Sequence, residues 1–181
     1  MSRAPIRALP ESVANLVAAG EVVQRPSSVV KELVENALDA GATEVDVVLL
    51  QAGRTRIQVR DNGHGIDPAD LPLALVRHAT SKLREPDDLF ALTTMGFRGE
   101  ALASMAAVGQ VSLRSRTADH EVGLELRCFG GEHEGSNPSP GPVGTTVTVD
   151  NLFFNVPARR QFLKSDPVEF KHVLETFDAL A

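Results

Sequence analysis

The sequence predicts an α/β fold in which an amphipathic helix lies against a sheet. Three patterns support this prediction. Apolar residues recur at helical spacing over residues 26–40, and apolar and polar residues alternate over 43–50 and 57–60. The same alternation dominates from residue 111 onward. The two short alternating stretches are joined by a turn at residues 52–53 and predict a β-hairpin. We therefore expect the helix to cover one face of a domain that is mostly sheet.

Composition restricts the class of protein. The chain has 181 residues, of which 43% are hydrophobic, enough for a core in one domain, or in one domain and the start of a second. The 24 acidic and 18 basic residues form no long single-sign run, so the net charge of −6 does not indicate nucleic-acid binding. The single cysteine, Cys128, excludes an internal disulfide and is expected in the core of a strand. Without a signal peptide or a long apolar run, we expect no membrane association and a cytoplasmic location, or a nuclear one in a eukaryote.

The segment KELVENALDA, residues 31–40, sets two polar side chains at the border of the buried helix face. The face expected to be buried comprises Val29, Val30, Leu33, Val34 and Ala37. The face expected in solvent comprises Lys31, Glu35 and Asp39. Glu32 and Asn36, four residues apart, lie one above the other between the two faces. A carboxylate at the edge of a core is costly without a partner or a task, so Glu32 is either a functional acid or part of an ion pair with a nearby Lys or Arg.

The second strand of the hairpin leads into Asp61-Asn62-Gly63-His64-Gly65. Two glycines one residue apart allow backbone conformations and close approaches that a side chain would prevent. A flat ligand could therefore rest on this turn with Asp61 at its edge. An ordinary Asn-Gly turn explains the same residues, so the motif alone leaves both interpretations open.

Turn and cap residues predict the other boundaries in the first half of the chain. Residues 1–10 are expected to form an extended arm, followed by a short helix over 12–19 that ends at Gly20. Ser27 or Ser28 is expected to cap the long helix, which ends at Gly41. Asp67-Pro68 is expected to begin another helix that continues to about residue 76.

Residues 77–99 are irregular in pattern apart from a brief helical piece near 87–92. Irregular segments of this length in compact domains are typical of a functional lid. Gly96 and Gly99 directly precede a helix predicted over 100–108. The free N-terminal amides and the dipole of such a helix favour an anion such as phosphate.

The last third of the chain is expected to be mostly sheet. Residues 136–142, rich in Ser, Pro and Gly, are expected to be an exposed loop. The strand at 144–149 places Thr145 beside a glycine, although threonine suits a strand without any functional reason. A short helix is expected over 158–164. The helix that begins at residue 166 continues to residue 181, so we expect a further domain to follow.

The order of these features resembles the GHKL ATPases, the family of gyrase B, the large heat-shock chaperone, sensor histidine kinases and MutL. Four longer stretches resemble the N-terminal ATPase region of the MutL branch: AAGEVVQRPSSVVKELVENALDAGAT, RHATSK, GFRGEALASMAAV and FFNVPARRQFL. The resemblance covers nearly the whole chain. RHATSK and GFRGEAL also argue against the topoisomerase and kinase branches.

The resemblance implies a two-layer α/β sandwich, the Bergerat-type ATP-binding fold, with helices on one face of a mostly antiparallel, mixed sheet and ATP held between the layers. It implies an arm and short helix over residues 1–20 and an ATP-binding domain over 21–165. The lid is then 77–99, and residues 166–181 begin a helix that leads to a following domain.

The resemblance also assigns roles to individual residues. Glu32 would be the general base for the water that attacks the γ-phosphate, and Asn36 would hold magnesium. The base of ATP would contact Asp61, Gly65 and Thr145. The phosphates would be surrounded by Lys82, Gly96, Phe97, Arg98 and Gly99.

In this family ATP orders the lid and the arm, so the resemblance implies a homo- or heterodimer with a MutL-type subunit. It implies further contacts with mismatch-recognition and downstream repair proteins, and with DNA through the full-length dimer. Because a lysine of the following domain completes the family's phosphate site, residues 1–181 alone are expected to be weak or inactive as an ATPase. The alternative is a nucleotide-responsive dimerisation module without significant turnover; the presence of Glu32 favours turnover.

Overall fold

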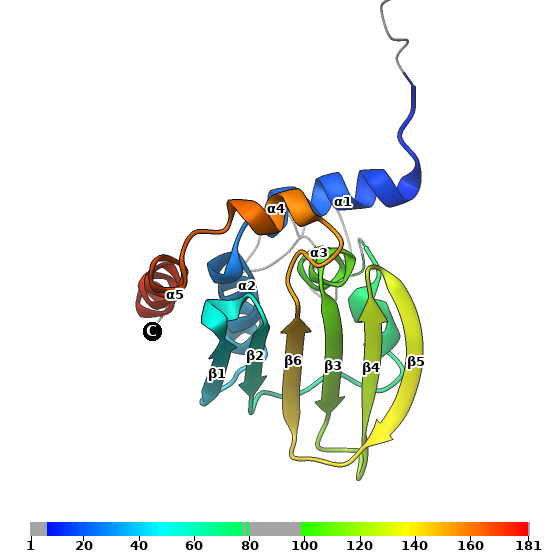
Figure 1. The fold of residues 1–181 in the computed structure, drawn as a ribbon. Coiled ribbons are helices and arrows are strands. Elements are labelled where there is room, and N and C mark those ends of the chain that lie inside the picture. The colour runs from blue at the N-terminus through cyan, green and yellow to red at the C-terminus, as the bar shows by residue number, and fades with distance from the viewer. Residues whose placement is uncertain (1–6, 78, 80–98, 181) are drawn as a thin grey trace, which may run out of the picture.

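The computed structural model describes residues 7–77, 79 and 99–180 and has one six-stranded sheet (Figure 1). The strand order is β1-β2-β6-β3-β4-β5, and every described pairing is antiparallel. The strands are β1 (Val45–Leu50), β2 (Arg56–Asp61), β3 (Gln110–Arg116), β4 (Gly123–Phe129), β5 (Glu132–Ser139) and β6 (Gly144–Asp150). The helices are α1 (Glu11–Val22), α2 (Pro26–Asp39), α3 (Ala101–Val108), α4 (Pro157–Phe162) and α5 (Asp166–Leu180), with short 3-10 turns η1 (Gln51–Gly53) and η2 (Leu71–Leu75).

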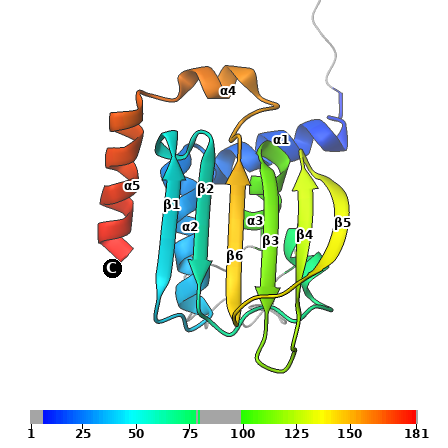
Figure 2. The same ribbon diagram turned by 60° about the horizontal axis from the view of Figure 1, so that its bottom comes forward.

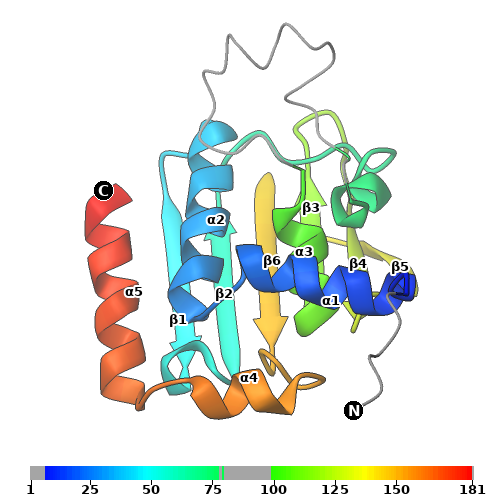
Figure 3. The same ribbon diagram turned by 90° about the horizontal axis from the view of Figure 1, so that it is seen from above.

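Helices α1, α2 and α3 cover the same face of the sheet, whereas α5 stands at its β1 edge beside α2 (Figure 3). Figure 2 shows the opposite face, on which none of the described helices lies. This arrangement confirms the predicted two-layer α/β sandwich. Among the described residues, no helix is long and apolar enough to cross a bilayer.

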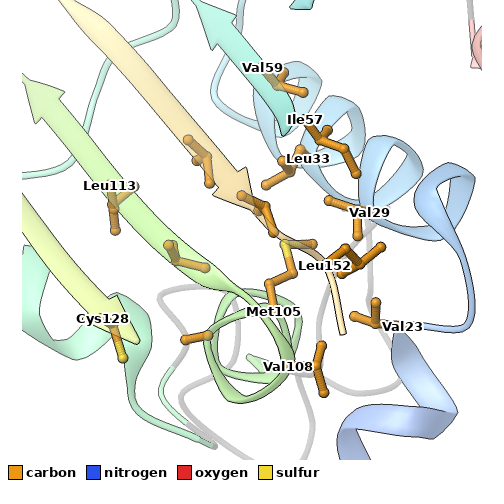
Figure 4. Close-up of a cluster of buried hydrophobic side chains, with 14 of the residues drawn as sticks. Val23, Val29, Leu33, Ile57, Val59, Met105, Val108, Leu113, Cys128 and Leu152 are labelled. Atoms are coloured by element: carbon orange, nitrogen blue, oxygen red, sulfur yellow. The ribbon is translucent and has the colours of Figure 1, made fainter. Parts of the chain in front are cut away.

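The core lies between the helices and the covered face of the sheet (Figure 4). The five apolar residues predicted for the buried face of α2 are all buried, and so is Cys128. Inward-facing residues of the central strands complete the core: Ile57, Val59, Val111, Leu113, Val147 and Val149. Because each fully buried Val or Leu contributes roughly 1.5–3 kcal/mol, this shared core holds α2 against the strands that carry the candidate site.

Two predictions for α2 are wrong. Glu35 is buried rather than exposed, with its Oε1 atom 2.9 Å from Nζ of Lys31. The pattern of a single helix does not include its neighbours: α5 packs against α2 on the side of Ser27 and Lys31, and Glu35 lies one helical turn after Lys31 on that side. Neither predicted serine caps the helix: the N-cap is Arg25, Pro26 is the first helical residue, and Ser27 is buried inside the helix.

The helix predicted to end at Gly20 instead continues to Val22. An ideal Cβ atom on Gly20 would lie 1.6 Å from Nη2 of Arg159, and Nη1 of Arg159 donates to the carbonyl of Val23 at 3.3 Å. The glycine therefore makes room for a side chain from α4, and its role is packing rather than termination.

Residues 67–76 do not form the expected α-helix. They form a turn followed by the 3-10 turn η2. Pro72 explains the difference, because proline has no N–H for an i−4 hydrogen bond and its ring collides with the carbonyl four residues earlier. An α-helix that started at Pro68 could not pass this position.

The loop predicted over 136–142 is also partly wrong, because residues 132–139 form β5. Among the described strands, β5 pairs only with β4, at the edge of the sheet. Proline is compatible with an edge strand, where an N–H can be missing without breaking a second ladder, so Pro138 does not prevent pairing.

Candidate functional site

The turn after β2 is fixed against the C-terminal end of α2. The His64 amide donates to the carbonyl of Ala40 at 3.0 Å, and an ideal Cβ atom on Gly63 would lie only 2.7 Å from that same oxygen. Oδ1 of Asn62 accepts hydrogen bonds from the amides of Thr43 at 2.8 Å and Glu44 at 3.0 Å. These contacts join the turn to the helix end and to the loop that follows the helix, and so set the position of Asp61.

The two carboxylate oxygens of Asp61 have different surroundings. Oδ1 accepts the backbone N–H groups of Gly63 at 2.9 Å and Thr145 at 3.3 Å. Oδ2 has no hydrogen-bond partner in the described part of the chain. Burial raises the pKa of Asp61, and the two N–H groups oppose this rise. The structure therefore presents a partly desolvated acceptor with one oxygen oriented and the other available to a ligand.

This pKa shift has a testable consequence for stability. A carboxyl whose folded-state pKa lies above its ordinary value of 3.8 stabilises the fold most below that value, and the stabilisation is lost as the pH rises through the folded-state pKa. Asparagine does not titrate. We therefore compare the melting temperature of Asp61→Asn with that of the unsubstituted chain by thermal unfolding. The difference, variant minus unsubstituted chain, should increase from pH 4 to pH 7. A difference that stays constant or falls over this range would contradict the shift.

Ser115 connects the turn to β3 and β6. Its buried Oγ accepts the amide of Ile66 at 2.8 Å, donates to the carbonyl of Gly144 at 3.1 Å, and lies 2.8 Å from Oγ1 of Thr145. Because Ser115 and Thr145 are direct partners on adjacent strands, their side chains share the covered face of the sheet. The turn, Asp61 and Thr145 thus belong to one hydrogen-bonded unit.

Two glycines of this unit are required by the protein backbone itself. Gly65 has a φ of +76°, and an ideal Cβ atom there would lie 2.2 Å from the carbonyl oxygen of Arg116. Gly144 has a φ of +123°, and its Cβ would lie 2.1 Å from the carbonyl oxygen of Asp61. The side-chain space of Gly65 is therefore filled by β3, so a ligand could approach this residue only along its backbone.

We expect Gly144→Ala to destabilise the chain by about 3 kcal/mol, since it combines a positive φ with a backbone collision. Gly131→Ala is the matched control, because Gly131 has a φ of +90° but no described residue has an atom within 4 Å of its ideal Cβ. The control should lose only about 1 kcal/mol, the cost of the backbone conformation. Urea-induced unfolding measures both values. Equal losses would mean that the collision is relieved by a small movement.

Glu32 and Asn36 are both half-buried on α2, at the border between its buried and exposed faces. The end of this helix at Ala40 contacts the turn that carries Asp61. At a rise of about 1.5 Å per residue, Asn36 lies roughly 6 Å and Glu32 roughly 12 Å from Ala40 along the helix axis. The helix thus carries Asn36 and Glu32 at increasing distance from the turn.

The remaining predicted positions lie near α3 or outside the described residues. Gly99 has a φ of +60° and lies two residues before Ala101, the first residue of α3. Lys82, Gly96, Phe97 and Arg98 lie outside the described residues, as does nearly all of the predicted lid. A cavity of about 320 Å³ between α2 and α5 contains none of the predicted site residues.

Sequence reasoning missed Ser115 and Gly144. A signal for Ser115 exists, because alternation in VSLRSR places it on the same face as Val111 and Leu113, where an apolar residue is expected. A serine at an inward position must have hydrogen-bond partners. The sequence does not show that these partners come from the turn and from β6, about 50 residues before and 30 residues after it.

The sequence model of the histidine kinase-, DNA gyrase B- and HSP90-like ATPase family matches residues 24–140. The DNA mismatch repair protein MutL of Phocaeicola vulgatus is 58% identical over 175 residues, which is 97% of this chain and 28% of the relative. That of Actinobacillus succinogenes is 54% identical over 178 residues, 98% of this chain and 28% of the relative. The chain therefore spans little more than a quarter of the length of these relatives.

Solved structures of DNA repair proteins also resemble this chain. The Aquifex aeolicus MutL ATPase domain complexed with ADP has a TM-score of 0.71 and 38% identity, covering 86% of this chain and 54% of that one. The N-terminal domain of a DNA repair protein has a TM-score of 0.76 and 30% identity, covering 91% of this chain and 47% of that one. The chain belongs to the histidine kinase-, DNA gyrase B- and HSP90-like ATPase family, in the branch formed by the MutL proteins.

Proposed function

We propose that the chain binds ATP at the turn after β2 and hydrolyses it in a magnesium-dependent reaction, as the ATPase part of a MutL-type DNA mismatch repair protein. The observation that carries this proposal is the Asp61 carboxylate, with Oδ1 held by two N–H groups and Oδ2 open to a ligand. Such an acceptor suits the amino group of adenine. The similar Aquifex aeolicus domain is complexed with ADP, which supports a nucleotide ligand.

The order of residues along α2 supports one orientation of the nucleotide. The base lies at the turn, against Asp61, Thr145 and the backbone of Gly65. The phosphates then extend along α2 past Asn36 toward Glu32, a distance of roughly 12 Å along the helix axis. The N-terminal amides of α3, preceded by Gly99, supply donors to phosphate oxygens. Lys82, Gly96, Phe97 and Arg98 complete this phosphate site in our proposal.

Glu32 is the general base of the proposed reaction. Its carboxylate orients a water molecule and accepts its proton as the water attacks the γ-phosphate. Asn36 offers an amide oxygen of the kind that magnesium prefers, and this ion usually takes only one or two protein ligands besides phosphates and water. Magnesium held there would neutralise charge on the phosphate oxygens. Among the described residues, no group of three or more His, Cys, Asp or Glu side chains forms a competing metal site.

The wider function follows from the relatives. Since they are bacterial mismatch repair proteins, we propose a cytoplasmic protein that dimerises with a MutL-type subunit when ATP binds. The dimer would then contact mismatch-recognition proteins, downstream repair proteins and DNA. Such coupling requires ATP to bind the dimeric state more tightly than the monomeric state.

The test is a nucleotide titration with and without magnesium that follows binding, phosphate release and mass together. We expect saturable ATP binding that strengthens with magnesium, slow turnover by residues 1–181 alone, and a higher mass in the ATP-bound state. If ATP binds and the mass increases but neither residues 1–181 nor the full-length protein releases phosphate, the chain is a nucleotide-responsive dimerisation module instead. Absence of ATP binding would overturn the proposal.

A further inference from the structure

The hydroxyl of Ser115 is saturated by its three neighbours. A serine hydroxyl has one proton to donate and two lone pairs to accept hydrogen bonds. The amide of Ile66 is a donor, so it occupies one lone pair, and the carbonyl of Gly144 is only an acceptor, so it takes the single proton. The third contact, to Oγ1 of Thr145, must therefore use the second lone pair of Ser115.

The same count determines the direction of the Thr145 hydroxyl. Because Ser115 has no second proton, Thr145 is the donor in the 2.8 Å contact between the two side chains. The proton of Thr145 thus points toward β3. Within the described residues Oγ1 of Thr145 has no other hydrogen bond, so its lone pairs remain for a ligand.

The Thr145 amide donates to Oδ1 of Asp61, so the Thr145 hydroxyl belongs to the same site as the open Oδ2 atom. The side chains of Asp61 and Thr145 then offer two acceptors and no proton to the base of a nucleotide. We propose that Ser115 is a positioning residue that holds Thr145 as an acceptor and thereby makes the site select a base with an exocyclic amino group. This inference rests on the proposed function, because it assumes that a nucleotide base occupies the site.

A purely structural role for Ser115 makes a different prediction. Its bond to Ile66 also attaches the turn to β3, so loss of the hydroxyl could weaken binding of every nucleotide by loosening the turn. Positioning of Thr145, in contrast, affects only nucleotides that carry the amino group. The informative quantity is therefore the ratio of affinities for ATP and for purine riboside triphosphate, in which hydrogen replaces the 6-amino group.

Dissociation constants for both nucleotides would be measured on the unsubstituted chain and on four variants of it. Ser115→Ala removes the acceptor of the Thr145 proton. Thr145→Val keeps the shape and the backbone amide of Thr145 but removes its hydroxyl. The third variant combines both substitutions. Ser112→Ala is the matched control, because Ser112 lies on the same strand but donates to Glu125 at 2.8 Å on the opposite face of the sheet.

We expect Ser115→Ala and Thr145→Val each to reduce the ATP preference roughly threefold to tenfold, the contribution of one neutral hydrogen bond. The double variant should show no further reduction, and Ser112→Ala should leave the preference unchanged. If Ser115→Ala does not fold, the result for Thr145→Val decides, and an unchanged preference in that variant overturns the inference. Equal weakening of both nucleotides by Ser115→Ala, or multiplying effects in the double variant, also overturns it. Failure of the unsubstituted chain to bind ATP would overturn the proposed function as well.

Discussion

Replacement of Glu32 by alanine is expected to abolish ATP hydrolysis while ATP still binds. In the proposed reaction Glu32 accepts the proton of the attacking water, and general-base catalysis of this kind contributes roughly 10²- to 10⁴-fold. In the proposed complex the base of the nucleotide lies about two helical turns away, at the end of α2, so we expect the contacts that hold it to be unaffected. Phosphate release and equilibrium binding, measured on the same preparation, separate the two steps.

Two further substitutions on α2 test the assignment of Glu32. Glu32→Gln keeps the size and polarity of the side chain but is a much poorer base, so it should be as inactive as Glu32→Ala. Glu35→Gln is the matched control, because Glu35 is another carboxylate of α2, which is buried and pairs with Lys31 at 2.9 Å. It should retain turnover. Loss of ATP binding in the Glu32 variants would give this residue a structural role instead.

Asp61→Asn is expected to weaken ATP binding by roughly 10²- to 10³-fold, since a buried site that loses the correct partner for a polar group discriminates strongly. Asparagine can still accept the amides of Gly63 and Thr145 through its carbonyl oxygen. Its NH₂ group would then replace Oδ2 and face the amino group of adenine, donor against donor. Isothermal titration measures the loss, and thermal unfolding verifies that the fold is retained.

Asp67→Asn provides a matched control for this substitution. Like Asp61, Asp67 accepts the amide of the residue two positions later, here Ala69 at 2.8 Å, but it is exposed and outside the proposed site. Its replacement should leave ATP affinity within about twofold, because surface substitutions of this kind cost little. Similar losses in both variants would show that turn geometry, rather than recognition of the base, determines binding.

Local periodicity was sufficient to predict the parts of the fold that depend on neighbouring residues. The buried face of α2 and the hairpin of β1 and β2 agree with the sequence pattern, because both reflect which side of a single element faces the core. Glu35 and β5 disagree for one shared reason. The environment of Glu35 depends on α5, and the formation of β5 depends on pairing with β4. The local sequence pattern gives no information on where these two neighbouring elements lie.

The candidate site shows the same division. Asp61, Gly65 and Thr145 could be proposed from the sequence, and the structure brings them into one hydrogen-bonded unit. Ser115, which joins this unit, was not proposed, because its partners are distant in the sequence. The turn was predicted as a possible ligand support, but the constraint on Gly65 comes from the backbone of β3 and becomes visible only in three dimensions.

The contact between the end of α2 and the turn after β2 also fixes the geometry of catalysis in the proposed reaction. One uninterrupted helix carries Glu32, and the residue at its C-terminal end holds the turn of Asp61. The distance between the proposed base site and the proposed site of bond cleavage is therefore set by the separation of eight residues from Glu32 to Ala40. Insertion of a single residue between Glu32 and Ala40 would rotate the carboxylate by about 100° relative to the turn. The number of residues between Glu32 and Ala40 is therefore constrained, because a change in it would separate the two tasks.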